Sequence, residues 1–456
     1  MDRLKPARTD SSRRRRRNTS VAGLLAAALI QVGCQQPQQQ PNVLLIVVDT
    51  LRADHLGAYG YDRPTSPNLD AMARRGILYT HAHSVTSWTN PSIEALFTGE
   101  EPRVLQPGAS AFIAQDQLTL AARFRALGYA TAAIVANPVL SPELGFGQGF
   151  DTYIGVAGWS EGFRVPPKQP AEQVNRAALQ WLADSSAVPK NRPWFLYLHY
   201  MDPHWPYQPP NETLRAFWRQ RNVDPDAASG PLNQRIRERI VQSADDVAQA
   251  TDLYDAAVAH LDDQLRRFFD SLDPSVLDRT IICIMADHGE ELGDHGRYLH
   301  AHTLYEELLH IPLLVVLPDR RAAQTNESFV QIYDVGRTLL ELANVADPAF
   351  PGTSLVGGRR PMPLHADLVG AAIQPSHRRA LIDGTSKLIE TTEGQFLLFD
   401  LVSDPHENTN LAMIRAKQLM RLRAAATRSD GLSGRTEIPI KDSAARERLR
   451  AFGYDF

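Results

Sequence analysis

Two runs of apolar residues, each ending in polar side chains, constrain this chain more than any other feature. Residues 42–48 (Asn-Val-Leu-Leu-Ile-Val-Val) and 280–286 (Thr-Ile-Ile-Cys-Ile-Met-Ala) are almost continuously aliphatic. Such runs are typical of central parallel strands that are covered on both faces. Asp49 follows the first run directly, and Asp287 and His288 follow the second. Because ligands bind beyond the carboxyl ends of parallel strands, we expect these side chains to converge if the two strands are neighbours.

Helical and strand patterns alternate along most of the chain. Helices are expected at 67–76, 118–127, 171–183 and 245–269, and further strands at 77–82, 129–136, 194–200 and 312–317. Alternation of this kind predicts an α/β fold with a doubly wound, mostly parallel sheet. Past residue 345 the strands become short and look antiparallel, and a basic helix follows near 414–425. We therefore expect a smaller C-terminal α+β subdomain at 346–456.

The first forty residues have the pattern of an export signal. The basic run Arg13–Arg17 precedes the apolar run Val21–Ile30, which is too short to span a bilayer as a permanent helix. Cys34 follows a glycine as in a bacterial lipoprotein signal, although Gln31 stands where leucine is usual. We expect a signal segment at 1–34 with a lipoprotein cysteine, a polar linker at 35–41, and an exported protein that is periplasmic or anchored to the membrane through lipid.

The composition of the chain is that of an ordinary globular protein. The 456-residue chain is 43% hydrophobic and 22% charged, with a net charge of −4. These values are ordinary for a globular protein and give no indication of nucleic-acid binding. With Cys34 assigned to lipidation, only Cys283 remains, so no disulfide framework is expected. The sequence does not indicate an oligomeric state.

The segment 89–99 (Thr-Asn-Pro-Ser-Ile-Glu-Ala-Leu-Phe-Thr-Gly) predicts a short, half-buried helix. Pro91 suits a first turn and Gly99 suits a helix end. Thr89 is then expected just before the helix N-terminus, where free N–H groups and the helix dipole favour an anion. A hydroxyl there could attack a bound phosphate or sulfate if its pKa were lowered. The alternative is an ordinary capping threonine.

Further polar side chains could complete a catalytic centre. Two carboxylates, an imidazole and the Thr89 oxygen make a plausible shell for a divalent cation, which would lower the pKa of the hydroxyl and polarise the ester oxygen. His204 lies in a proline-bounded loop after the expected strand at 194–200, and His300 and His302 lie in a loop after Asp287.

The chain resembles the sulfatase family of the alkaline-phosphatase superfamily. The resemblance is carried by residues 42–60, 64–76, 89–99, 195–207, 286–312 and 387–410, in the order of the family. The family pattern Cys/Ser-x-Pro-Ser-Arg-x-x-Leu-Leu-Thr-Gly corresponds to the segment that begins at Thr89. The resemblance implies an alkaline-phosphatase-like fold, with residues 42–345 as the catalytic domain.

The resemblance also implies roles for individual residues. The metal ligands that it implies are Asp49, Thr89, Asp287 and His288. Thr89 occupies the nucleophile position, and His204 corresponds to the histidine that holds the anionic oxygens of the ester. His300 or His302 stands near a substrate-gripping lysine of many relatives, and one of them would protonate the leaving group. The family implies Ca²⁺ as the single divalent metal, with Mn²⁺ and Zn²⁺ left open. Because several relatives that act on phosphates use two metals, Asp202, His204, His300 and His302 are candidates for a second cation site.

Three departures from the family pattern bear on the reaction. Thr50 replaces the second aspartate of the usual pair, and Ile93 replaces the usual arginine. Thr89 cannot be oxidised to the formylglycine that sulfatases make from Cys or Ser. We therefore expect a metal-dependent hydrolase of sulfate-type or phosphate-type esters with Thr89 as nucleophile, acting on an anionic small molecule or glycan. The alternatives are a phospho-headgroup transferase and a non-catalytic binder of anionic glycans.

Overall fold

The computed structural model describes nine ranges of the chain. These are residues 40–102, 112–156, 170–220, 222–241, 243–318, 323–345, 347–357, 363–368 and 376–427. The chain from Gln40 onward forms one compact unit. The predicted signal, Cys34 and residues 35–39 of the predicted linker lie outside the described ranges. Within those ranges no helix has both the length and the apolar character needed to cross a membrane.

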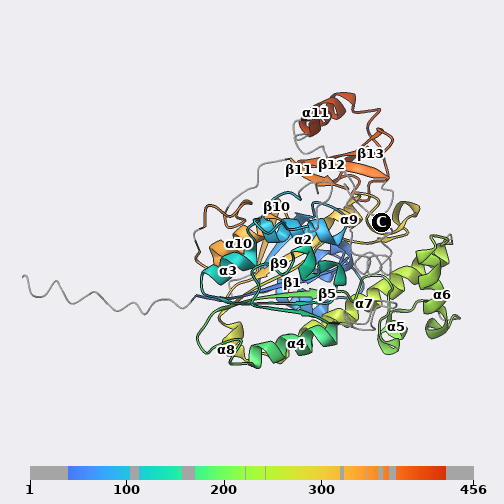
Figure 1. Ribbon diagram of the computed structural model, residues 1–456. Coiled ribbons are helices and arrows are strands. Elements are labelled where there is room, and N and C mark those ends of the chain that lie inside the picture. Colours follow the sequence, from blue (N-terminus) through green and yellow to red (C-terminus); the bar gives the residue numbers. More distant parts are fainter. Residues whose placement is uncertain are drawn as a thin grey trace, which may run out of the picture. The chain divides into compact units, whose positions relative to one another are not determined.

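A central sheet of eight strands organises the unit (Figure 1). Its strands are β1 (Asn42–Val48), β2 (Ile77–His83), β3 (Ala130–Val135), β4 (Thr152–Gly155), β5 (Trp194–Tyr200), β6 (Thr280–Ala286), β9 (His310–Val316) and β10 (Gln324–Gln331). Their order is β10-β2-β9-β6-β1-β5-β3-β4. All neighbours are parallel except that β9 runs antiparallel to both β2 and β6. The predicted mostly parallel sheet is confirmed.

Helices cover both faces of this sheet (Figure 1). One layer contains α2 (Thr89–Thr98), α3 (Leu120–Ala126) and α10 (Asp334–Leu342), and the other contains α4 (Ala171–Ala183), α7 (Ala244–Asp270) and α8 (Pro274–Leu277). Shorter elements are α1 (Pro67–Ala73), α5 (Asn211–Phe217), α6 (Pro225–Arg237), α9 (Glu306–Leu309) and 3₁₀ turns at Ala53–His55, Gly57–Tyr59, Pro138–Leu140, Pro142–Leu144 and Asp294–Gly296. Because helices lie on both sides, every residue of β1, β5 and β6 is buried, which explains their apolar sequences.

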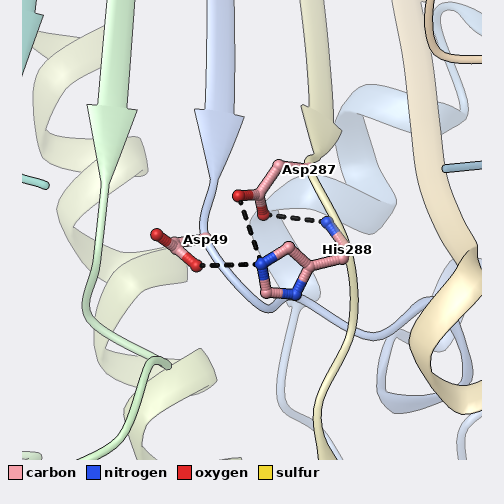
Figure 2. A group of neighbouring side chains, drawn as sticks. All are labelled: Asp49, Asp287 and His288. Atoms are coloured by element: carbon pink, nitrogen blue, oxygen red, sulfur yellow. Dashed lines mark hydrogen bonds and ion pairs between the residues drawn. The ribbon is translucent and has the colours of Figure 1, made fainter. Parts of the chain in front are cut away.

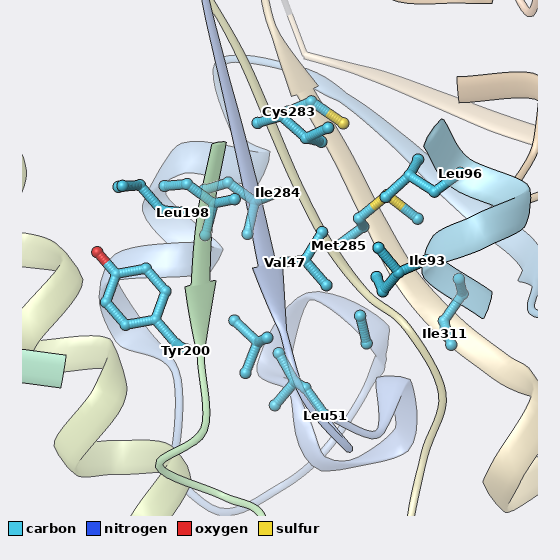
Figure 3. Close-up of a cluster of buried hydrophobic side chains, with 14 of the residues drawn as sticks. Val47, Leu51, Ile93, Leu96, Leu198, Tyr200, Cys283, Ile284, Met285 and Ile311 are labelled. Atoms are coloured by element: carbon cyan, nitrogen blue, oxygen red, sulfur yellow. The ribbon is translucent and has the colours of Figure 1, made fainter. Parts of the chain in front are cut away.

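Helix α2 is packed against the sheet by its apolar side chains. Figure 3 shows Ile93 and Leu96 of this helix lying toward Met285 of β6 and Ile311 of β9. All four side chains are fully buried. This contact fixes the start of α2, and with it Thr89, above the carboxyl ends of β1 and β6.

A second, smaller sheet lies in the C-terminal part of the chain. Its antiparallel strands are β11 (Leu364–Asp367), β12 (His377–Asp383), β13 (Ser386–Thr391) and β14 (Phe396–Asp400), followed by α11 (Ala416–Thr427). A two-stranded hairpin, β7 (Glu291–Leu292) with β8 (Tyr298–Leu299), precedes α9. The expected small antiparallel unit is confirmed, and with it the predicted fold class.

Candidate active site

The site is built where β1 and β6 end side by side. The two strands are in parallel register, with Val48 opposite Ala286, so the next residues, Asp49 and Asp287, also face each other. Figure 2 shows both carboxyl groups and the His288 ring pointing toward one another just past the strand ends. The Nε2 atom of His288 lies 3.8 Å from Asp49 Oδ1 and 3.5 Å from Asp287 Oδ2. All three residues are fully buried.

Each carboxylate has one oxygen engaged in hydrogen bonds and one that is not. Asp287 Oδ1 accepts from the backbone N–H groups of Thr50 (3.2 Å) and His288 (2.8 Å). Asp49 Oδ2 accepts from Asn137 Nδ2 at 2.7 Å. Asp49 Oδ1 and Asp287 Oδ2 have no hydrogen-bond partner among the described residues. Burial, together with the nearby charge of Asp287, raises the pKa of Asp49 well above its usual value.

The orientation of His288 makes its Nε2 atom the available ligand. Its Nδ1 atom lies 2.9 Å from the carbonyl oxygen of Gly289, which can only accept, so Nδ1 carries the proton in the neutral ring. The lone pair is then on Nε2, which faces the two carboxylates. Burial alone would lower the pKa of His288, but Asp287 and Asp49 outweigh that effect and raise it.

Thr89 lies beside this group of three residues. Its position relative to helix α2 differs from the one expected from the sequence. It is the first residue of α2, and Trp88 is the residue before the helix. The expectation that Thr89 precedes the helix is therefore wrong by one residue, because α2 begins two residues before Pro91. The hydroxyl still lies at the N-terminus, 3.4 Å from Asp49 Oδ2 and 3.3 Å from His288 Nε2.

The residues fit a divalent cation. Among the described residues, Asp49, Asp287 and His288 are the one group of three whose ligand atoms all lie within 4.8 Å of one another. Two buried carboxylate oxygens without hydrogen bonds would be unfavourable by themselves, and a bound cation would compensate them. The second site proposed for Asp202, His204, His300 and His302 has no comparable cluster within the described ranges.

Two further imidazoles line the same region. The ring centroid of His300 lies 4.7 Å from that of His288 and 5.0 Å from that of His204. The Nδ1 atom of His300 is 2.7 Å from Glu290 Oε1, and the Nδ1 atom of His204 contacts the Trp205 carbonyl. Burial lowers the pKa of both His204 and His300, and it raises the pKa of Glu290 to about 7.

His302 lies apart from these rings. Its Nδ1 atom is 2.6 Å from the carbonyl oxygen of His300, and its Nε2 atom is 2.5 Å from Glu291 Oε2. Both ring nitrogens are thus occupied by contacts that hold the loop. Of the two histidines between which the sequence could not choose, His300 is the one beside His288 and His204.

Asp202 also points elsewhere. Its Oδ1 atom lies 3.8 Å from His260 Nε2 in α7 and accepts from the Ala171 N–H of α4 at 3.4 Å. Burial raises the pKa of Asp202 to about 7. The side chain therefore belongs to the contact between β5 and the helices α4 and α7, away from the cluster at Asp49.

Sequence reasoning missed three residues that support the site. Asn137 bonds Asp49, Glu290 contacts His300, and His199 Nε2 lies 4.0 Å from Asp49 Oδ2. Asn137 follows β3 almost directly, as Asp49 follows β1, so the same pattern of a polar residue after a buried strand could have identified it. His199 is opposite Val47 in the register and shares its face of the sheet, and therefore that of Asp49.

Two of the departures from the sulfatase pattern have visible structural settings. Thr50 has a backbone φ of 58°, and its Oγ1 atom is buried without a hydrogen-bond partner among the described residues. Ile93 is fully buried in the hydrophobic cluster beneath α2 (Figure 3). An apolar cluster thus occupies the place where the family pattern has a charged side chain.

Known proteins match the chain over most of its length. The family model described as Sulfatase matches residues 41–345. A choline-sulfatase from Rhizobium meliloti is 26% identical over 435 residues, covering 82% of each chain. A multifunctional alkaline phosphatase superfamily protein from Trinickia caryophylli is 27% identical, over 81% of this chain and 91% of the relative.

Solved structures show the same fold. A protein in complex with its substrate D-glucosamine-2-N,6-O-disulfate has a TM-score of 0.71 and 19% identity, covering 86% of this chain and 98% of that one. A phosphonate monoester hydrolase of Agrobacterium radiobacter has a TM-score of 0.66 and 21% identity, with coverage of 85% and 94%. The chain belongs to the sulfatase family and is an ester-hydrolysing enzyme.

Proposed function

We propose that the protein hydrolyses sulfate-type or phosphate-type esters, with Thr89 as the nucleophile and one divalent cation bound by Asp49, Asp287 and His288. The observation that carries this proposal is the placement of the Thr89 hydroxyl, 3.3 Å from His288 Nε2 and 3.4 Å from Asp49 Oδ2, at a helix N-terminus. The same geometry favours an enzyme over a non-catalytic binder. The family resemblance implies Ca²⁺.

In the proposed reaction the Thr89 oxygen attacks the phosphorus or sulfur atom of the ester. A bond from Oγ1 to that atom forms, the bond to the leaving alcohol oxygen breaks, and the proton of the Thr89 hydroxyl passes to Asp49 Oδ2, which lies 3.4 Å away. The bound anionic ester favours the doubly protonated form of both rings, so that His204 Nε2–H holds the anionic oxygens and His300 gives its Nε2 proton to the leaving oxygen. Water then cleaves the ester on Thr89 and releases inorganic sulfate or phosphate. When bound, the cation supplies positive charge that lowers the hydroxyl pKa and polarises the ester.

The substrate is proposed to be an anionic ester of a small molecule or a glycan. Two relatives support the glycan class by name, an N-acetylglucosamine-6-O-sulfatase from Bacteroides thetaiotaomicron and the protein solved with D-glucosamine-2-N,6-O-disulfate. A threonine that carries the transferred group must be freed by water attacking that group, which is how phosphoryl-transfer enzymes with a Thr or Ser nucleophile work. Phosphate-type esters are therefore candidate substrates alongside sulfates. We also propose that the enzyme is exported and lipidated at Cys34.

The purified protein should be tested with divalent cations on nitrophenyl sulfate, phosphate, a phosphodiester and a phosphonate. Thr89→Ala should abolish turnover of whichever substrate is cleaved, and Thr89→Ser should retain part of it. Mass spectrometry of the quenched reaction should find the Thr89 peptide heavier by a sulfo or a phospho group. Turnover that survives in Thr89→Ala would contradict the proposal.

A further inference from the structure

We infer that the cation site at Asp49, Asp287 and His288 is a four-coordinate site that prefers Zn²⁺ to Ca²⁺. The inference rests on the proposed function, which places a cation beside Thr89, and it deepens that proposal by naming the class of cation. Ca²⁺ takes six to eight oxygen ligands, whereas Zn²⁺ is usually bound by four nitrogen, sulfur or oxygen ligands. The number and kind of ligand atoms that this chain offers therefore decide between them.

Asp287 can offer only one oxygen. Its Oδ1 atom accepts two backbone hydrogen bonds, from Thr50 N (3.2 Å) and His288 N (2.8 Å). These two N–H groups use the lone pairs of Oδ1 and fix the plane of the carboxylate. Only Oδ2, which lies 3.5 Å from His288 Nε2, remains for a cation.

Asp49 is held in a similar way. Its Oδ2 atom accepts from Asn137 Nδ2 at 2.7 Å and lies 3.4 Å from Thr89 Oγ1. Its Oδ1 atom faces His288 Nε2 at 3.8 Å and has no hydrogen-bond partner in the described part of the chain. Both carboxylates are thus arranged to bind through a single oxygen each, as in a site of low coordination number.

The four side chains together offer the cation one nitrogen and three oxygen ligand atoms. His288 contributes Nε2, the two aspartates contribute one oxygen each, and Thr89 contributes its hydroxyl. Imidazole is a better ligand for zinc than for calcium. A site whose two carboxylates offer a single oxygen each is poor in the oxygen atoms that Ca²⁺ needs.

Thr50 stands where the sulfatase pattern has a second aspartate, so the site has one carboxylate fewer than that pattern. Its backbone N–H is bound to Asp287, so it lies directly beside the cluster. Its φ of 58° is in the left-handed region, which β-branched residues rarely adopt and which asparagine and aspartate adopt much more often. Thr50→Asp would therefore suit the backbone and add a carboxylate, and Thr50→Asn would make the same backbone change without the charge.

The test compares cation binding by the full chain after the protein is stripped of metal with a chelator. Calorimetric titration with Zn²⁺ and with Ca²⁺ should give tighter binding of Zn²⁺ by the wild-type protein. Thr50→Asp should lower the ratio of Zn²⁺ to Ca²⁺ affinity by about tenfold or more, because the charge and number of carboxylates set Ca²⁺ affinity. Thr50→Asn should leave that ratio unchanged.

The coordination number of the bound cation can be measured separately, by the visible absorption of Co²⁺. Co²⁺ in the wild-type site should give the intense visible absorption of a four-coordinate ion. This reading decides the matter even if Thr50→Asp does not fold. Weak absorption typical of six ligands, Ca²⁺ binding as tight as Zn²⁺ binding, or an equal shift in both Thr50 variants would overturn the inference. If Ca²⁺ binds preferentially and supports turnover, the inference about zinc fails while the proposed function stands. If Thr89→Ala retains turnover, the proposed function itself fails.

Discussion

The Nδ1 atom of His300 lies 2.7 Å from Glu290 Oε1, and both side chains are buried beside the site. A carboxylate at that distance accepts a hydrogen bond from Nδ1–H and fixes the orientation of the ring. The proposed proton donor is therefore positioned by a residue that follows His288 by two places. Glu290 acts through His300 and is a positioning residue.

We expect His300→Ala to lower kcat by about 10²-fold for esters of poorly acidic alcohols, and less for nitrophenyl esters, because good leaving groups need no proton. Glu290→Ala should reproduce this dependence on the leaving group with a smaller loss. The measurement is kcat for a series of esters that differ in the pKa of the leaving alcohol. His302→Ala is the matched control: it should affect all substrates alike, and a dependence on the leaving group there would contradict the assignment.

Asn137 is expected to tune cation affinity through Asp49. Its amide is 2.7 Å from Asp49 Oδ2, and the loss of such a partner typically lowers metal affinity by about 10–100-fold. Asn137→Ala should show this loss in a cation titration. Asn175→Ala removes a buried asparagine that bonds Tyr200 and Gln264 instead, so cation affinity should stay at the wild-type value even where stability falls.

A third prediction concerns pH and the buried Lys387. Its Nζ atom lies 2.8 Å from Glu306 Oε1 and 3.1 Å from Glu407 Oε2, and burial raises the pKa of Glu407 to about 8. The folded protein then keeps a proton on Glu407 that the unfolded chain loses near the ordinary glutamate pKa. From about pH 4.5 to about pH 8 this group lowers the free energy of unfolding by up to roughly 1.4 kcal/mol per pH unit.

Urea unfolding at pH 5, 6, 7 and 8 tests this sign. Glu407→Gln mimics the protonated side chain, so the variant should lose less stability than the wild type as the pH rises. The comparison isolates Glu407, because Asp202 and Glu290, whose pKa values burial also raises to about 7, are present in both proteins. Parallel pH curves for the two proteins would exclude the raised pKa.

The buried position of Ile93 gives a prediction about the family arginine. Ile93 is fully buried in the cluster that holds α2 against β6 and β9. Restoring the family residue with Ile93→Arg would place an unpaired charge there and should cost at least about 3 kcal/mol of stability. Ile93→Leu keeps the volume and should cost less than about 1.5 kcal/mol. Thermal and urea unfolding measure both; an Arg variant as stable as the wild type would show that the cluster accommodates the charge.

The sequence by itself determined the strands and the residues at their ends. β1 and β6 are recognisable because a strand covered on both faces must be apolar throughout. Asp49, Asp287 and His288 are recognisable because they end these strands. Thr89 is marked by a helix start with proline, and the sulfatase pattern places it among relatives. All of these signals are local, and each depends on neighbours in the chain.

Only the tertiary structure decided which of the remaining polar groups meet. His300 and His302 are only two residues apart, but His300 lines the site and His302 holds the loop. This difference depends on their contacts with Glu290 and Glu291, which lie about ten positions earlier. Asn137 reaches Asp49 only because β3, β5 and β1 are adjacent in the sheet. The single free oxygen of each aspartate likewise follows from hydrogen bonds between distant segments. Strand order and such bonds join residues that are far apart in the chain, so no local pattern of residues encodes them.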